Sequence, residues 1–142
     1  MARTLDMKSL TLEAARQLAD AALEAAEAEG LRLHVTVVDA AGHVLIYQRM
    51  PGAPYPAREF SENKAFTALS FGKPTSVWKD RLGANPHLAA GLSRHPKVTM
   101  IGGGAPVVIE GEIVGAIGIA GGLEDQDIAI VCRALAAAGY DG

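Results

Sequence analysis

Five polar residues recur at three- and four-residue steps along one segment of the chain: Arg58, Glu59, Asn63, Lys64 and Thr67. On a helix, such spacing brings side chains together on one face. Lys64, Arg58 and Glu59 are the candidate catalytic residues, because a cation beside a carboxylate can bind a substrate carboxylate or transfer a proton. Asn63 and Thr67 are candidate ligand contacts. An exposed helix face with ordinary ion pairs shows the same pattern, so both interpretations stay open.

A second set of candidates is made of glycine. The stretch 100–122 holds eight of the 16 glycines, among β-branched residues. Bare backbone N–H groups can bind an anion, above all next to the start of a helix. Turn geometry alone is the competing explanation. The candidate ligand-binding glycines stand at the two ends of the stretch: Gly102, Gly103, Gly104, Gly121 and Gly122.

The histidines and the cysteine show no metal-ligand spacing, so we predict no metal site. His34 and His43 are expected at a surface or an interface, whereas His87 and His95 fall in an irregular segment where a ligand pocket could recruit them. Cys132 is alone and is expected to be an inert core thiol. No phosphate-binding loop, dinucleotide fingerprint or nucleophile elbow is present.

The composition indicates one globular domain, residues 1–142, with 49% apolar and 20% charged residues. A formal charge of -3 argues against nucleic acid or an anionic membrane as a partner. No run approaches the roughly 20 apolar residues that span a bilayer. The first residues lack an apolar signal-peptide core, so we expect a cytoplasmic protein. With nucleic acid and membrane disfavoured, the expected partner is a small molecule.

Three helices are expected to position the candidate residues. They cover 11–29, 57–71 and 124–138, each with helical apolar spacing and with Gly30, Gly72 or Gly139 just beyond the end. The stretch 75–96 is expected to be irregular or only briefly helical, with Asn85-Pro86 as a helix-start signal. The chain is rich in alanine, and flat small-residue faces favour packing against a second copy. We therefore expect a homo-oligomer that uses the N-terminal helix.

Five strands are expected, at 31–37, 44–49, 97–101, 107–109 and 113–119. Short turns join most of them, which requires antiparallel pairing. The predicted fold is therefore α+β, a five-stranded antiparallel sheet with helices packed on it.

Two glycines, Gly115 and Gly118, fall inside the last predicted strand. Glycine weakens a strand, so its presence there indicates a bulge, a bend, or another backbone or a ligand lying flat on that face.

Several ordered motifs resemble the GlcG/HbpS (DUF336) family, which includes the C-terminal domain of PduO-type adenosyltransferases. The resemblance covers about residues 10 to 138. It rests on the segments 63–68, 102–106 and 115–122, together with Thr75 and Gln126-Asp127. It implies a profilin-like three-layer domain and a homo-oligomer, often an octamer.

For function, the resemblance implies binding of haem, a corrinoid-related ligand or iron. PduO-type members that bind haem are associated with a histidine in the N-terminal helix, and segment 11–29 has neither His nor Cys. The resemblance therefore implies haem as a possible cofactor, but this chain has no histidine at the place where those members have one. The first hypothesis is a protein that binds haem, another tetrapyrrole or a small carboxylate. The alternative is a cofactor-independent isomerase, tautomerase or lyase acting on a small carboxylate, and a purely structural subunit is third.

Overall fold

The computed structural model describes residues 1–140. Its helices lie close to the predicted positions, because apolar spacing and terminal glycines mark them well. The elements in chain order are α1 (Leu12–Ala28), β1 (His34–Asp39), β2 (Val44–Arg49), α2 (Ala57–Phe71), the 3-10 turn η1 (Thr75–Val77), α3 (Trp78–Gly83), α4 (Pro86–Leu92), β3 (Gly104–Ile109), β4 (Glu112–Ala120) and α5 (Glu124–Ala137).

The sheet is antiparallel with the strand order β2-β1-β4-β3. It has four strands among the described residues, so the prediction of five is wrong. The missing strand is the stretch 97–101, whose β-branched residues misled the prediction. Its backbone bonds to α2 instead: the Thr99 N–H donates to Thr67 Oγ1 at 3.0 Å, and that hydroxyl donates to the Lys97 carbonyl at 3.4 Å.

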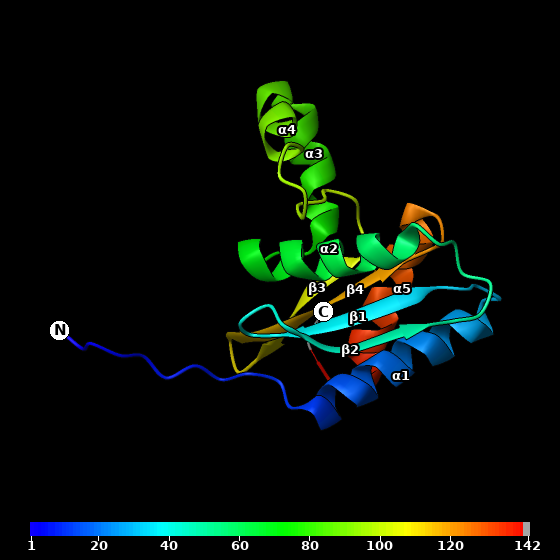
Figure 1. Ribbon diagram of the computed structural model, residues 1–142, viewed down its shortest axis with the longest axis horizontal. Coiled ribbons are helices and arrows are strands. Elements are labelled where there is room, and N and C mark those ends of the chain that lie inside the picture. The colour runs from blue at the N-terminus through cyan, green and yellow to red at the C-terminus, as the bar shows by residue number, and fades with distance from the viewer. Residues whose placement is uncertain (141–142) are drawn as a thin grey trace.

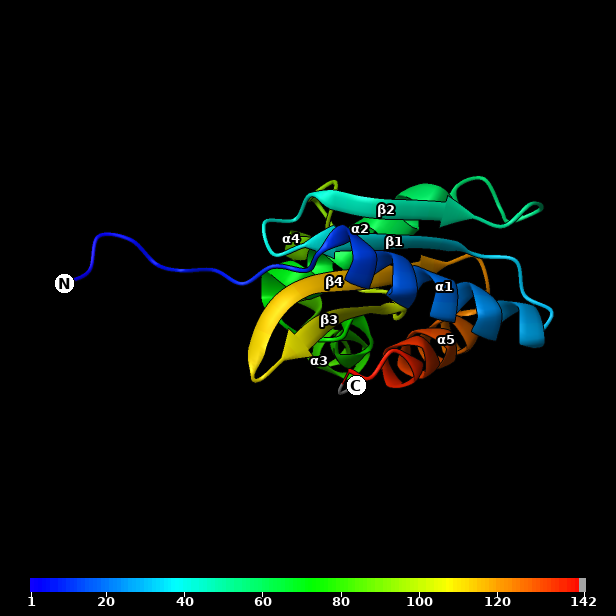
Figure 2. The same cartoon turned by 90° about the horizontal axis from the view of Figure 1, so that it is seen from below.

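The domain has three layers, with α2 on one face of the sheet and α1 and α5 on the other (Figures 1 and 2). Because both faces are covered, β1 is buried almost throughout. The likeness to profilin stays a prediction. The alanine-rich face of α1 is used inside the chain, where Leu18, Ala19 and Ala22 pack into the core.

Glycines let α2 approach the sheet closely. A Cβ atom at Gly118 would collide with the Ser61 carbonyl and lie 2.6 Å from the Ala65 nitrogen, and one at Gly104 would collide with the Lys64 carbonyl. Of the explanations offered for strand glycines, the close approach of another backbone is therefore confirmed at Gly118. The β3–β4 turn is also as predicted, with left-handed φ angles of 51° at Glu110 and 79° at Gly111.

Several segments lie outside the three layers. The helices α3 and α4 project beyond α2, and the N-terminal segment extends away from the domain (Figure 1). Leu10 rejoins the sheet, where its N–H donates to the Val114 carbonyl at 2.9 Å. Cys132 is exposed on α5, so the prediction of a core thiol is wrong: the helix buries Val131 and Ala134 and turns Cys132 outward. No helix among the described residues could span a membrane.

Candidate functional site

A pocket of about 310 Å³ opens where α2, the end of β4 and the start of α5 meet. Its wall is mostly apolar, and three charged side chains, Lys64, Glu124 and Asp127, reach into it. The remaining lining residues are Pro54, Pro56, Ala57, Phe60, Ile101, Ala120, Gly121 and Gly122. We call it the Lys64 pocket.

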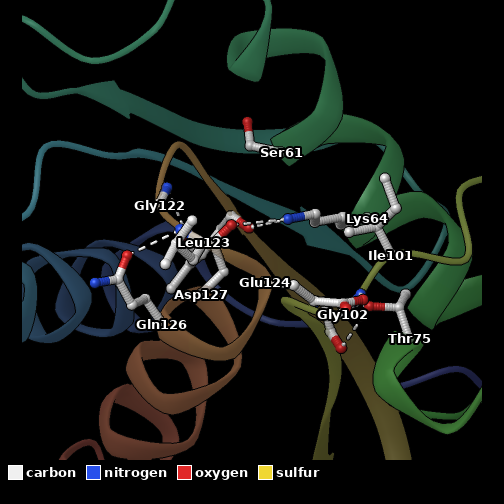
Figure 3. Close-up of polar contacts among 12 residues, drawn as sticks. Ser61, Lys64, Thr75, Ile101, Gly102, Gly122, Leu123, Glu124, Gln126 and Asp127 are labelled. Carbon is white, nitrogen blue, oxygen red and sulfur yellow. Dashed lines mark hydrogen bonds and ion pairs between the residues drawn. The ribbon is translucent and has the colours of Figure 1, made fainter. Parts of the chain in front are cut away.

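An ion pair forms the floor of this pocket. Lys64 Nζ lies 3.1 Å from Asp127 Oδ2, and each side chain is only 3% exposed (Figure 3). The same ammonium donates to the Ile119 carbonyl at 2.9 Å. Lys64 comes from α2 and Asp127 from the first turn of α5, so the pair links the two outer layers across the end of β4.

Burial dominates the electrostatics of Asp127. It raises the pKa of this carboxyl above its ordinary value, and the nearby Lys64 charge and the N–H groups of Gly122 and Gly121 offset only part of the rise. A carboxyl with a raised pKa beside an ammonium can take up or release a proton within the pocket. Asp127 is therefore a carboxyl on the pocket floor whose protonated form is favoured by burial.

The glycine N–H groups are less available than the sequence suggested. The Gly102 N–H donates to Glu124 Oε2 at 2.8 Å, that of Gly104 to Thr75 Oγ1 at 2.9 Å, and that of Gly122 to Asp127 Oδ1 at 3.0 Å. The expectation of bare N–H groups is therefore wrong at these three positions, because side chains of the same chain reach them first.

Close packing is the observed role of Gly103. A Cβ atom there would lie 2.6 Å from the Ile119 carbonyl oxygen and 2.9 Å from Lys64 Nζ. Gly121 and Gly122 still line the Lys64 pocket, so their ligand-binding role stays a prediction.

The five candidates on α2 do not share one site. Lys64 lines the pocket just described, whereas Arg58 lines another cavity beside Tyr47. Glu59 is exposed and lines neither. Arg58 and Lys64 are six residues apart, and six residues of helix rotate a side chain by about 240°. The two side chains therefore point to different sides of α2, although both belong to the series of polar residues spaced by three and four.

The two predicted ligand contacts also lie apart. Asn63 lines a small hollow with Phe66 and Lys97. Thr67 is fully buried, and its hydroxyl fixes the segment before β3 through the bonds to Lys97 and Thr99. Thr67 is therefore a structural residue in this fold.

Comparison with known proteins identifies the family. The HbpS-like family, described as "haem degrading protein HbpS-like", matches residues 10–136. The chain belongs to the HbpS-like family. A 15.0 kDa protein from the dhaT-dhaS intergenic region of Citrobacter freundii is 33% identical over 132 residues, which cover 89% of this chain and 90% of that protein.

Solved structures of HbpS-like proteins have the same fold. The crystal structure of HbpS matches with a TM-score of 0.86 and 38% identity over 96% of this chain and 95% of that one. A crystal structure described as a PduOC–haem complex matches with a TM-score of 0.81 and 31% identity over 94% and 97% of the two chains. The resemblance stated from the sequence motifs is therefore confirmed.

Within this HbpS-like fold, the histidines lie away from the Lys64 pocket. His34 is 1% exposed, so the expectation of a surface position is wrong: α2 and the loop after β2 cover the strand face that it occupies. His43, His87 and His95 are exposed, and the ring of His95 stacks on Phe66.

Sequence reasoning did not include Asp127 among the candidate site residues. A signal was present, because Asp127 stands four and seven residues before Val131 and Ala134 and thus shares their buried stripe. A carboxylate on the core side of a helix needs a partner, and Lys64 provides it. Phe60 and Glu124 had no comparable signal, since their place in the pocket depends on how α2 meets α5.

Proposed function

We propose that this HbpS-like chain binds a carboxylate-bearing ligand in the Lys64 pocket. The observation that carries the proposal is the buried Lys64 ammonium at the floor of an apolar pocket. An ammonium has three N–H donors, and among the described residues Ile119 and Asp127 accept two of them. The third is left for a ligand oxygen, and the apolar wall suits the ligand's body.

Relatives support ligand binding at this coarse level. One structural neighbour is described as a complex with haem, and the family description names haem. Haem, other tetrapyrroles and small organic acids all carry carboxylates, so the same ammonium could receive any of them. The proposal therefore names the shared group, and its test separates the sources.

The pocket does not fit a haem whose iron is held by a protein side chain. Its lining contains no His, Cys, Met or Tyr. Lys64 Nζ is already engaged by Asp127 Oδ2 and the Ile119 carbonyl, so it offers no free ligand for the iron. A flat ligand would instead lie against Phe60 and Ile101.

Two titrations distinguish the ligand classes. We expect calorimetry of 3-phenylpropionate to show a site that the variant Lys64→Met/Asp127→Leu loses. The neutral amide should bind at that site at least about tenfold more weakly, because a charge-assisted hydrogen bond contributes about 1.5–3 kcal/mol. Haemin is titrated in parallel by absorbance, and we expect no spectrum of a side-chain-ligated iron. The control is the double variant Lys64→Met/Asp127→Leu, which removes the pair without leaving a buried charge. Equal affinity of acid and amide for the wild type would refute the proposal.

Ligand binding should depend on pH. A ligand carboxylate bound to Lys64 lies close to the Asp127 carboxylate, and two neighbouring negative charges repel, so binding should favour protonation of Asp127, whose pKa is already raised. The affinity for 3-phenylpropionate should therefore increase as the pH falls towards the raised pKa of Asp127, by up to about tenfold per pH unit where one proton is taken up. Calorimetry in two buffers of different ionisation enthalpy measures that uptake. An affinity independent of pH, with no proton exchanged, would contradict this coupling.

We also propose a homo-oligomer, with a second copy covering the rim of the Lys64 pocket. Leu123 is 72% exposed, and Phe60 and Ile101 are each 43% exposed at this rim. From the sequence, we expected the alanine-rich face of α1 to form the interface, but that face is buried in the core of its own chain. We therefore propose these apolar side chains as the interface instead. Light scattering should give a multiple of the 14.7 kDa chain mass, and Leu123→Glu should shift the mass towards that of the monomer. A wild-type monomer at micromolar concentration would exclude the proposal.

A further inference from the structure

The loop between β2 and α2, residues 50–56, contains three prolines. A second pocket, of about 360 Å³, lies on the other side of this proline-rich loop from the Lys64 pocket. The loop divides the two: Pro54 and Pro56 line the first, and Ala53 and Tyr55 line the second. The other residues of the second pocket are His34, Tyr47, Arg49 and Arg58. We call it the arginine pocket.

Strand register places three of these side chains together. His34 on β1 pairs with Arg49 on β2, and Thr36 pairs with Tyr47. Side chains two residues apart in a strand share a face, so His34, Tyr47 and Arg49 lie on one face. Thr36, on that face, bonds to Ser61 of α2 at 2.8 Å, which identifies it as the α2 side. Arg58, in the first turn of α2, completes the pocket from above.

Hydrogen bonds hold this pocket in place. One ring nitrogen of His34, Nε2, lies 2.7 Å from the Pro54 carbonyl, which can only accept, so Nε2 carries a proton. In the neutral imidazole Nδ1 is then an acceptor, and it receives the Tyr47 hydroxyl at 2.6 Å. The Arg58 guanidinium lies over the Tyr47 ring, 4.9 Å from its centroid. This series of contacts, which runs from the Pro54 carbonyl through His34 and Tyr47 to Arg58, therefore fixes both the loop and the guanidinium.

The charge of the arginine pocket is not neutralised. Its lining has two arginines and no carboxylate, and within residues 1–140 neither guanidinium lies within 4.0 Å of an acidic oxygen. The Lys64 pocket, by contrast, carries its own carboxylates. Arginine offers a planar fork of donors that matches carboxylate and phosphate oxygens. The rings of Tyr47 and Tyr55 add flat apolar surface on which an aromatic body can stack.

We infer that the arginine pocket is a second ligand site, which takes an aromatic anion whose carboxylate or phosphate meets Arg49 and Arg58. This site is independent of the function proposed for the Lys64 pocket. Tyr47 is a positioning residue, because it holds the Arg58 guanidinium through its ring and is itself held by His34.

The test uses benzoate and phenyl phosphate as probes and benzamide as the neutral analogue, titrated by calorimetry into the full chain. We expect at least one of the two anions to bind, at least about tenfold more tightly than benzamide. Arg58→Gln and Arg49→Gln should each weaken that binding by about tenfold to a hundredfold. Arg94→Gln removes an exposed arginine elsewhere and should leave the affinity unchanged. Comparing the two anions shows whether carboxylate or phosphate is preferred.

The location of binding provides the second measurement. Amide chemical shifts should move at Tyr47, Ala53 and Tyr55 on adding the anion, and these shifts should persist in the Lys64→Met/Asp127→Leu variant, which lacks the cation of the Lys64 pocket. The inference is overturned if neither anion binds better than benzamide, or if Arg58→Gln and Arg49→Gln, melting like the wild type, keep full affinity. Shifts confined to Gly122 and Asp127 would also overturn it, because they would assign the anion to the Lys64 pocket.

Discussion

Gly118→Ala is expected to lose about 3 kcal/mol of folding free energy or more, the upper end of the cost of overpacking, although it adds only one methyl group. Gly118 lies in the central strand β4, where it pairs with Thr36 on one side and Gly104 on the other. The new Cβ would collide with the Ser61 carbonyl and lie 2.6 Å from the Ala65 nitrogen. Both are backbone atoms of α2, so no side-chain rotation relieves the contact, and the whole helix would have to move off the sheet.

The matched control is Gly91→Ala. Gly91 lies in α4, has no atom within 4 Å of an added Cβ, and has a φ angle suited to any residue. Alanine is favoured over glycine inside a helix by about 0.5–1 kcal/mol, so this variant should be unchanged or slightly more stable. Urea unfolding followed by circular dichroism compares the two. Equal midpoints for Gly118→Ala and the wild type would show that α2 does not pack as closely as the structure has it.

Most of the secondary structure could be predicted from local signals. The helix expected over 57–71 has those bounds, since helix formers fill it and Gly72, with φ 68°, ends it. The strand expected over 44–49 is likewise confirmed. These elements carry their own start and stop signals, so the sequence alone locates them.

The fifth strand could not be judged locally. The stretch 97–101 has strand-like residues, but a strand also needs a partner edge, and the described sheet ends at β3. The Thr67 hydroxyl offers its backbone a different partner. Burial of His34 was missed for a related reason, because local sequence does not show that α2 covers the face of the sheet on which His34 lies.

The site was predictable only in part. Lys64, a candidate catalytic residue from the sequence, lines the first pocket, but its partner Asp127 stands 63 positions later in the chain, on the last helix. Nothing in the spacing relates the two. Grouping Arg58 with Lys64 failed because helical steps of three and four accumulate rotation, and the structure assigns the two cations to separate pockets.

Lys64→Met should destabilise the fold by about 3–5 kcal/mol at neutral pH, because it leaves the Asp127 carboxylate buried without its cation. Methionine keeps most of the volume of the lysine stem, so little of the loss would come from a cavity. The double variant Lys64→Met/Asp127→Leu should recover most of this stability, since replacing a buried ion pair with apolar residues is often neutral or stabilising. Urea unfolding of both variants and the wild type measures the difference.

The deficit of Lys64→Met should also depend on pH, in a direction set by Asp127. Without the ammonium that lowers it, the pKa of Asp127 in the folded chain should rise further above its ordinary 3.8. A carboxyl whose folded pKa is raised contributes stability that is complete below the unfolded pKa and is lost as the pH rises through the folded pKa. The gap between Lys64→Met and the wild type should therefore be small near pH 4 and widen towards pH 8. A cavity would give the same difference in unfolding free energy at every pH. A pH-independent difference would therefore show that the variant is destabilised by lost packing and not by the unpaired Asp127 carboxylate.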